Sequence, residues 1–102
     1  MAGHGEGAVV MLIAKVIGTI VATRKHERLV GSKIQVVQPL DCKGEKADGE
    51  PFVAIDAVGA GVTERVIVVR GSGARQGVDD NVSPVDAAIV GIIDRIDIEA
   101  DI

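Results

Sequence analysis

The chain has 102 residues and a net charge of −4, which is the size of one compact domain and an unfavourable charge for nonspecific nucleic-acid binding. Its composition is 47% hydrophobic but only 1% aromatic, with no Trp and no Tyr, so base-stacking platforms are missing and the core must consist of Val, Ile, Leu and Ala. The single cysteine, Cys42, excludes an intrachain disulfide and a multi-cysteine zinc site, which fits a reducing compartment such as the cytoplasm. The sequence has no run of about 18 apolar residues, so it predicts no membrane-spanning helix.

The N-terminal half of the chain predicts two strands. The first ten residues, MAGHGEGAVV, are glycine-rich, so we expect residues 1–11 to be a flexible extension and residues 12–102 to be a single domain. LIAKVIGTIVA, residues 12–22, alternates with period two and predicts a strand whose even-numbered residues share one face, with Lys15 and Thr19 on the other. KIQVVQPL, residues 33–40, predicts a second strand with Ile34 and Val36 inward and Lys33 and Gln35 outward.

The hydrophilic stretch DCKGEKADGEP, residues 41–51, contains two glycines and a proline. This composition is typical of a surface hairpin loop. We therefore expect residues 41–51 to accept insertions or deletions with little effect.

The C-terminal half predicts three strands and one short helix. FVAIDAV at 52–58 and RVIVVR at 65–70 are apolar runs of strand length, separated by a GAG turn at 59–61. Ser83, Pro84 and Asp86 form a capping pattern that predicts a short helix at the start of PVDAA. Isoleucine and alanine then alternate with charged residues over 95–102, which predicts a half-buried final strand.

The candidate chemical motifs give weak signals. VIVVRGSGARQG, residues 66–77, resembles a phosphate-binding turn, but the third glycine comes one residue late and no Gly-Lys-Ser or Gly-Lys-Thr is present. His4 and His26 have no ligand partners at metal-binding spacing. The carboxylates of Asp56, Asp86 and Asp94 fit capping or turn roles better than acid–base catalysis. We therefore expect no enzymatic activity, no cofactor and no metal.

The basic run from Arg24 to Arg28 is compatible with a phosphate or an acidic partner, although such runs are more often solvated loops. AIVGIID and VIVVR carry apolar residues on both faces, more than one small barrel can bury. Strands that are apolar on both faces need a second covering layer. We expect that layer to be another copy of the chain.

Four segments occur in an order that points to a known family: AKVIGTIVAT, AIDAVGAGVTERVIVV, GSGARQ and PVDAAIVGIID. Together they resemble the vertex proteins of bacterial microcompartment shells, a family that includes carboxysome and ethanolamine-utilisation members. The resemblance covers about residues 12–98. It is weakest at the ends and in residues 41–51, and Gly73 stands where Ser or Ala is common in the family.

The resemblance implies an all-β fold, a small five-stranded OB-like barrel with one short helix, assembled into a cyclic pentamer. Such pentamers close a polyhedral shell at its five-fold corners, beside hexagonal shell proteins, in the bacterial cytoplasm. The expected partners are therefore other copies of the chain and the hexagonal shell proteins, with no nucleic acid and no membrane. An OB-like module that binds nucleic acid or a small ligand is the alternative, because the fold alone does not decide function.

The resemblance also gives the glycine turns a role in subunit packing or near the five-fold axis. Small residues let two backbones approach closely, and an arginine brings several donors to a neighbouring subunit. The residues so assigned are Gly59, Ala60, Gly61, Gly71, Ser72, Gly73, Ala74, Arg75 and Gln76.

Overall fold

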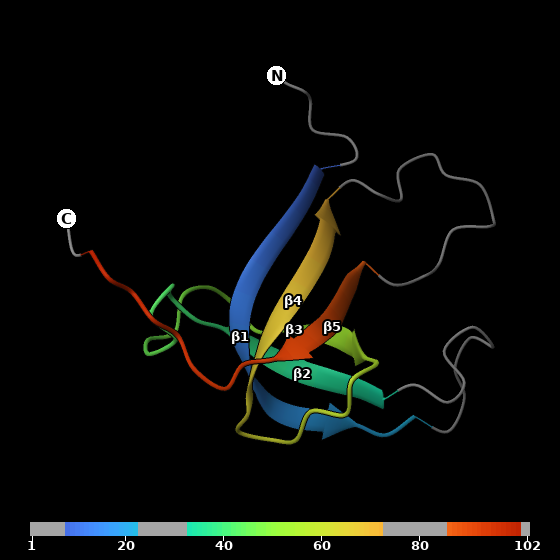
Figure 1. The fold of residues 1–102 in the computed structure, drawn as a ribbon. Helices are drawn as coiled ribbons and strands as arrows, with labels where there is room; N and C mark the ends of the chain where they lie inside the picture. The colour runs from blue at the N-terminus through green and yellow to red at the C-terminus, as the bar shows by residue number, and fades with distance from the viewer. Residues whose placement is uncertain (1–7, 23–32, 73–85, 101–102) are drawn as a thin grey trace.

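A closed barrel of five strands makes up the fold (Figure 1), and the computed structural model describes residues 8–22, 33–72 and 86–100. In the barrel the strands follow the order β1-β2-β3-β5-β4, and β4 closes back on β1. All neighbours are antiparallel except β3 and β5, which pair in parallel at only two positions. The strands are β1 (Ala8–Ile20), β2 (Lys33–Pro39), β3 (Phe52–Asp56), β4 (Arg65–Ser72) and β5 (Ala87–Ile92).

Small and β-branched side chains fill the barrel, because alternate residues of every strand point inward and a five-stranded barrel has little interior space. Phe52, the single aromatic residue of the sequence, lies at the end of the barrel where β3 begins, with the Arg70 guanidinium carbon 4.1 Å from its ring centroid. At the other end of β3 lies the carboxylate of Asp56. The buried apolar core is Ala14, Val16, Val37, Ala54, Ala60, Val66, Val68, Ala87 and Ile89.

The predicted inward faces of the first two strands were wrong in part. In β1, Val16 pairs with Val37 and Gly18 with Val36, so Ile17 is an extra residue that forms a β-bulge. The bulge reverses the alternation, and Thr19, not Gly18 or Ile20, lies on the same side as the core residues before it.

The face predicted for β2 is reversed. Gln35 and Val37 are fully buried, whereas Ile34 and Val36 lie on the outside of the barrel and are half-buried. The prediction followed hydropathy, which assigns a glutamine to solvent. In the barrel Gln35 is buried because every polar atom of its side chain has a hydrogen-bond partner.

The number of strands was predicted correctly, but the fifth strand lies elsewhere. β5 occupies residues 87–92, and residues 95–100, the described part of the predicted strand at 95–102, form no strand pairing to any described residue. The predicted helix therefore cannot continue into Ala87 and Ala88, while Ser83 and Pro84 lie outside the described residues. β1 begins at Ala8, so residues 8–11 belong to the barrel and not to the predicted extension.

The loop that follows β2 is more ordered than its hydrophilic composition predicts. Leu40 and Ala47 form an isolated antiparallel bridge, and the Asp48 amide donates to the Pro39 carbonyl at 2.9 Å. Gly44, at φ 72°, lies under the C-terminal segment, since a Cβ there would stand 2.8 Å from Cδ1 of Ile96. None of the described residues forms a helix that is long and apolar enough to cross a membrane.

Candidate subunit interface

The turn after β3 is built around the carboxylate of Asp56. Its Oδ1 accepts hydrogen bonds from the amides of Val58 at 2.8 Å and Gly59 at 2.9 Å, and its Oδ2 accepts one from the Ala60 amide at 2.7 Å. Gly59 has φ 85°, a conformation that glycine adopts without the steric cost of a Cβ. The aspartate thus fixes the path of the predicted GAG turn, in agreement with the expectation that it serves backbone donors at a turn.

A buried glutamine connects this turn to the neighbouring strands. Nε2 of Gln35 donates to Oδ2 of Asp56 at 3.0 Å and to the Ala60 carbonyl at 2.7 Å, while its Oε1 accepts from the Thr19 hydroxyl at 2.6 Å. One side chain therefore ties β1, β2 and β3 to the turn. Sequence reasoning missed Gln35, and the signal for it was a polar residue between the apolar residues Ile34 and Val36.

The environment of Asp56 stabilises its ionised form. Burial by itself acts to raise the pKa of this carboxyl group, but the backbone amides and the Gln35 amide group bind the carboxylate and outweigh that effect. The pKa of Asp56 is therefore lowered from its ordinary value. A carboxyl group held in this way is a structural anchor, because a general acid or base needs an accessible proton and a pKa nearer to neutrality.

The two glycine turns predicted as interface elements lie at opposite ends of β4. Residues 59–61 precede β4, whereas Gly71 and Ser72 are its last residues and pair with Val9 and Ala8 of β1. The described part of the second turn, Gly71 and Ser72, is therefore not brought together with residues 59–61. Gly73, Ala74, Arg75 and Gln76 lie outside the described residues, as do His4, His26 and the basic run 24–28.

The outside of the barrel is rich in apolar side chains. Val9, Met11 and Val21 of the N-terminal region are 65%, 69% and 90% exposed, and Val90 of β5 is 51% exposed. These side chains occur on several strands and not on one alone. The other large apolar side chains that are exposed are Val10, Ile17, Ile20, Val53, Val58, Val62, Ile92 and Ile98.

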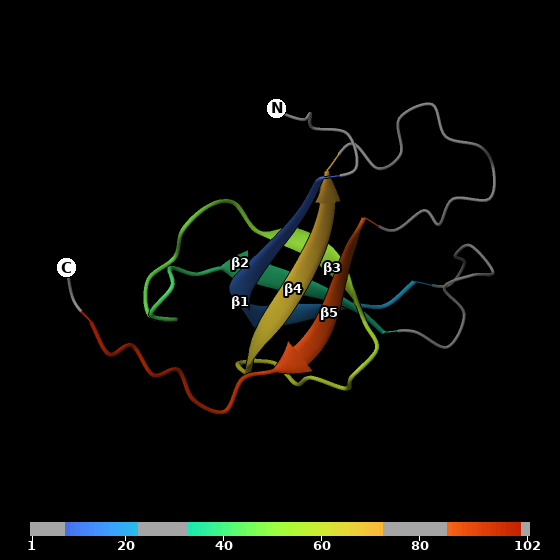
Figure 2. The same cartoon turned by 45° about the horizontal axis from the view of Figure 1, so that its top comes forward.

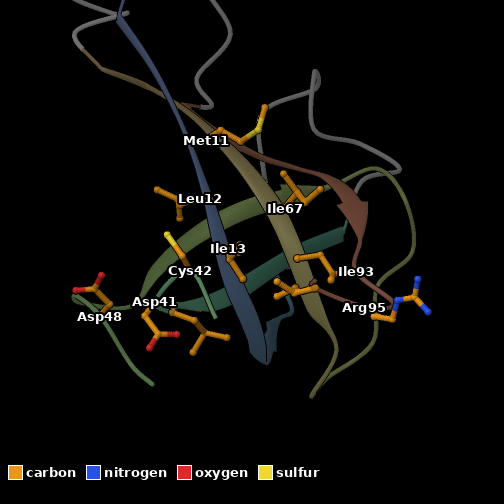
Figure 3. Close-up of a pocket in the computed structure, with 11 residues that line it drawn as sticks. Met11, Leu12, Ile13, Asp41, Cys42, Asp48, Ile67, Ile93 and Arg95 are labelled. Carbon is orange, nitrogen blue, oxygen red and sulfur yellow. The ribbon is translucent and has the colours of Figure 1, made fainter. Parts of the chain in front are cut away.

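A groove of about 540 Å³ lies along β1 (Figure 3). Met11, Leu12 and Ile13 of this strand line the groove, and Leu12 also packs against the core. One wall comes from the loop after β2, which contributes Asp41, Cys42 and Asp48, and the opposite wall comes from Ile67 of β4 and from the segment after β5. Among the described residues, no group of His, Cys, Asp or Glu could hold a metal ion.

Comparison with known proteins identifies the family. The family described as "Ethanolamine utilisation protein EutN/carboxysome" matches residues 11–94 of the chain. The chain belongs to this family. It is 51% identical over 89 residues to the carboxysome shell vertex protein CcmL of Synechococcus elongatus, covering 87% of this chain and 89% of that protein. It is also 43% identical over 86 residues to the bacterial microcompartment shell vertex protein EutN of Salmonella typhimurium, covering 84% and 86%.

Solved structures of the EutN/CcmL family have the same fold. The pentameric microcompartment shell protein GrpN of Rhodospirillum rubrum matches with a TM-score of 0.71 and 46% identity, covering 86% of this chain and 99% of that one. Gloeobacter violaceus CcmL matches with a TM-score of 0.69 and 40% identity, covering 86% and 90%. The prediction of family and barrel fold from the ordered segments is thereby confirmed.

Proposed function

We propose that the chain forms the pentameric vertices that close the shell of a bacterial microcompartment, within the bacterial cytoplasm. The observation that carries this proposal is the apolar outer surface of the barrel, which remains exposed after the core is filled. The membership in the EutN/CcmL family and the similarity to a pentameric relative support it. A vertex protein acts through shape and association, so its functional site is its set of contact surfaces.

Ring closure explains why apolar residues occur around the barrel and not on a single face. In a cyclic pentamer, every subunit contacts two neighbours through two different surfaces, and the ring closes only if each contact turns by one fifth of a circle. The groove across β1 and the apolar residues on the outside of β2 and β3 are two such surfaces. Hexagonal shell proteins would then surround each pentamer at a corner of the shell.

The two glycine turns keep their proposed places in this assembly. The Asp56-anchored turn of Gly59, Ala60 and Gly61 would lie near the five-fold axis, where a compact backbone lets five copies approach closely. Gly71 to Gln76 would contact the neighbouring subunit, with Arg75 donating hydrogen bonds across the contact.

The proposed role requires neither catalysis nor a cofactor. The most polar buried group that the structure describes, Asp56, is fully engaged by turn amides and Gln35. The alternative, an OB-like module for nucleic acid or a small ligand, is not favoured, because the relatives found are shell vertex proteins and the net charge is −4.

Native mass spectrometry of the purified protein tests the association. We expect a species of five chains at micromolar concentration, and a monomer under these conditions would contradict the proposal. Co-production with hexagonal shell proteins, followed by electron microscopy, tests the vertex role separately. We expect closed particles with the chain present and open sheets or tubes without it, whereas closed particles in both samples would overturn the vertex role even for a pentamer.

A further inference from the structure

The segment after β5, residues 93–100, has the sequence pattern of a strand but no strand partner among the described residues; we call it the C-terminal arm. Ile96, Ile98 and Ala100 alternate with Arg95, Asp97 and Glu99. After the Ile93 amide, which donates to the Arg65 carbonyl at 2.9 Å, no backbone group of the arm bonds to another described backbone group. Figures 1 and 2 show the arm extending away from the barrel in both views.

The arm is only partly held by its own chain. Ile96 lies against Gly44 in the loop after β2, and Arg95 forms an exposed ion pair with Asp97 at 3.1 Å. Ile98 lies beside Lys43 and Glu45 of the same loop but remains 50% exposed. An extended segment with an apolar face in water is expected to bury that face in a partner.

Beside the groove, one edge of β1 lacks a strand partner among the described residues. β2 pairs with β1 from Ala14 to Ile20, and Leu40 donates to the Ile13 carbonyl, but residues 8–12 of β1 pair only with β4 among the described residues. Among the described residues, the edge of β1 from Val9 to Leu12 therefore has no partner on the side of β2. Val9, Val10 and Met11 are exposed apolar residues of this edge, and Met11 lines the groove.

We infer that the C-terminal arm of one copy binds as an added strand along the β1 edge and groove of a second copy. Addition of an extended segment to an open sheet edge is an established mode of recognition, in which backbone hydrogen bonds give affinity and alternate side chains enter pockets. The inference rests on the proposed ring, and it gives that ring one specific contact. The second copy is the occupant because the arm has no strand partner among the described residues of its own chain and is apolar on one face, as is the groove.

The lone cysteine gives a direct test in the full chain, because Cys42 is exposed and lies in the groove wall. Ile98→Cys and Ala100→Cys each place a second thiol on the apolar face of the arm. After mild oxidation or treatment with a short bis-maleimide, we expect a ladder of covalent oligomers up to the pentamer on a denaturing gel. Because Ile98 also lies beside Lys43 and Glu45 of its own loop, some internal cross-linking of Ile98→Cys is expected; internally cross-linked monomers with no ladder for either variant would overturn the inference.

Two control variants test whether the cross-link is specific. Ile98→Cys combined with Cys42→Ser should give no ladder, because one thiol of the pair is missing. Val62→Cys, an exposed site on the turn before β4, should leave Cys42 uncross-linked. Native mass spectrometry of the same samples separates the two proposals: an intact pentamer with unreacted thiols overturns only the arm contact, whereas a monomer overturns the ring as well.

A matched pair of substitutions measures the contribution of the apolar face. Ile98→Ser should raise the concentration at which the ring dissociates about tenfold or more, because a buried isoleucine side chain loses its favourable transfer from water. Glu99→Ser, on the polar face, should change that concentration less than about threefold. Equal effects of the two substitutions would contradict the assigned face.

Discussion

At the scale of single residues, the stability of the barrel depends on a few polar side chains that are buried and hydrogen-bonded. Asp56 and Gln35 lie at the end of an interior otherwise filled by Val, Ala and Ile, and together they bind three successive turn residues. Removing either side chain leaves buried donors or acceptors without a hydrogen bond, and this costs more stability than an average hydrogen bond contributes.

Asp56→Asn should lower the free energy of unfolding by about 1–3 kcal/mol at neutral pH, because the amide nitrogen that replaces Oδ2 cannot accept from the Ala60 amide. The same substitution should reduce the acid sensitivity of the protein. The pKa of Asp56 is lowered in the folded state, so its stabilising effect is complete above the unfolded pKa of about 3.9 and is lost as the pH falls through the folded value. Urea unfolding between neutral and acidic pH measures both effects.

In the Asp56→Asn variant, Asp41 should still make the stability of the protein depend on acidic pH. Its pKa is also lowered, chiefly by the hydrogen bond from the Glu45 amide, so some loss of stability at low pH should remain. Glu50→Gln, which removes an exposed carboxylate, serves as the control. An acid dependence identical in Asp56→Asn and in the wild type would contradict the role assigned to Asp56.

Gln35→Met tests the buried glutamine with a side chain of similar length. We expect a loss of about 1–3 kcal/mol, since the Ala60 carbonyl and the Thr19 hydroxyl lose a partner inside or near the core. Gln38→Met is the matched control, because Gln38 also donates to two carbonyls but is only partly buried. Chemical denaturation should show the smaller effect for Gln38, and the reverse order would contradict the assignment.

Arg75→Ala tests the proposed contact of the GSGARQ segment. If Arg75 donates hydrogen bonds to a neighbour, its removal should cost about 1–3 kcal/mol at each interface of the ring. Circular dichroism should remain rich in β-structure while native mass spectrometry shifts toward monomer. A stable Arg75→Ala pentamer that has lost a nucleotide response present in the wild type would instead favour phosphate binding.

At the scale of elements, the loop after β2 is held at several points and not only at its ends. Asp41 accepts from the Glu45 amide, and Gly44 supports Ile96 of the C-terminal arm. Deleting Gly44 to Asp48 should therefore lower the midpoint of thermal unfolding, contrary to the tolerance that its composition predicts. An insertion after Glu50, where the residues are exposed, should change that midpoint little. Equal midpoints for the two variants would support the expectation from composition that residues 41–51 tolerate changes in length.

The sequence predicted the elements better than their orientations and partners. Four strands were found near their observed positions because β-branched runs between glycine turns are a local signal. The bulge at Ile17 was not predictable, since it depends on the pairing of β1 with β2. Residues 95–100 alternate as a strand should, whereas the pattern at 87–92 is almost wholly apolar, and only the barrel shows which segment is paired within the chain.

The candidate site was predictable only where it depends on residues that are close in sequence. The role of Asp56 follows from its place before a glycine turn, a relation between residues close in sequence. Gln35 acts on a carboxylate 21 positions away, and the groove joins β1, β4 and the loop after β2. Such relations arise only when the barrel closes, so no local pattern predicts them.

At the scale of the whole molecule, folding and association should be linked. If apolar outer surfaces are covered in the ring, the folded state is stabilised by every neighbour and the midpoint of unfolding depends on protein concentration. Raising the concentration from about 1 to about 100 µM should raise the thermal midpoint measurably. A midpoint independent of concentration, for a protein shown to be pentameric, would mean that the ring dissociates before the barrel unfolds.

The position of β5 between β3 and β4 determines when a newly made chain can complete its fold. β3 and β4 are synthesised first, yet they do not pair with each other, and the last strand must enter between them. Until residues 87–92 have left the ribosome, both flanking strands expose an unsatisfied edge, a state prone to mispairing. The barrel is therefore expected to close only after β5 has been made, and the subunits are expected to associate after that step.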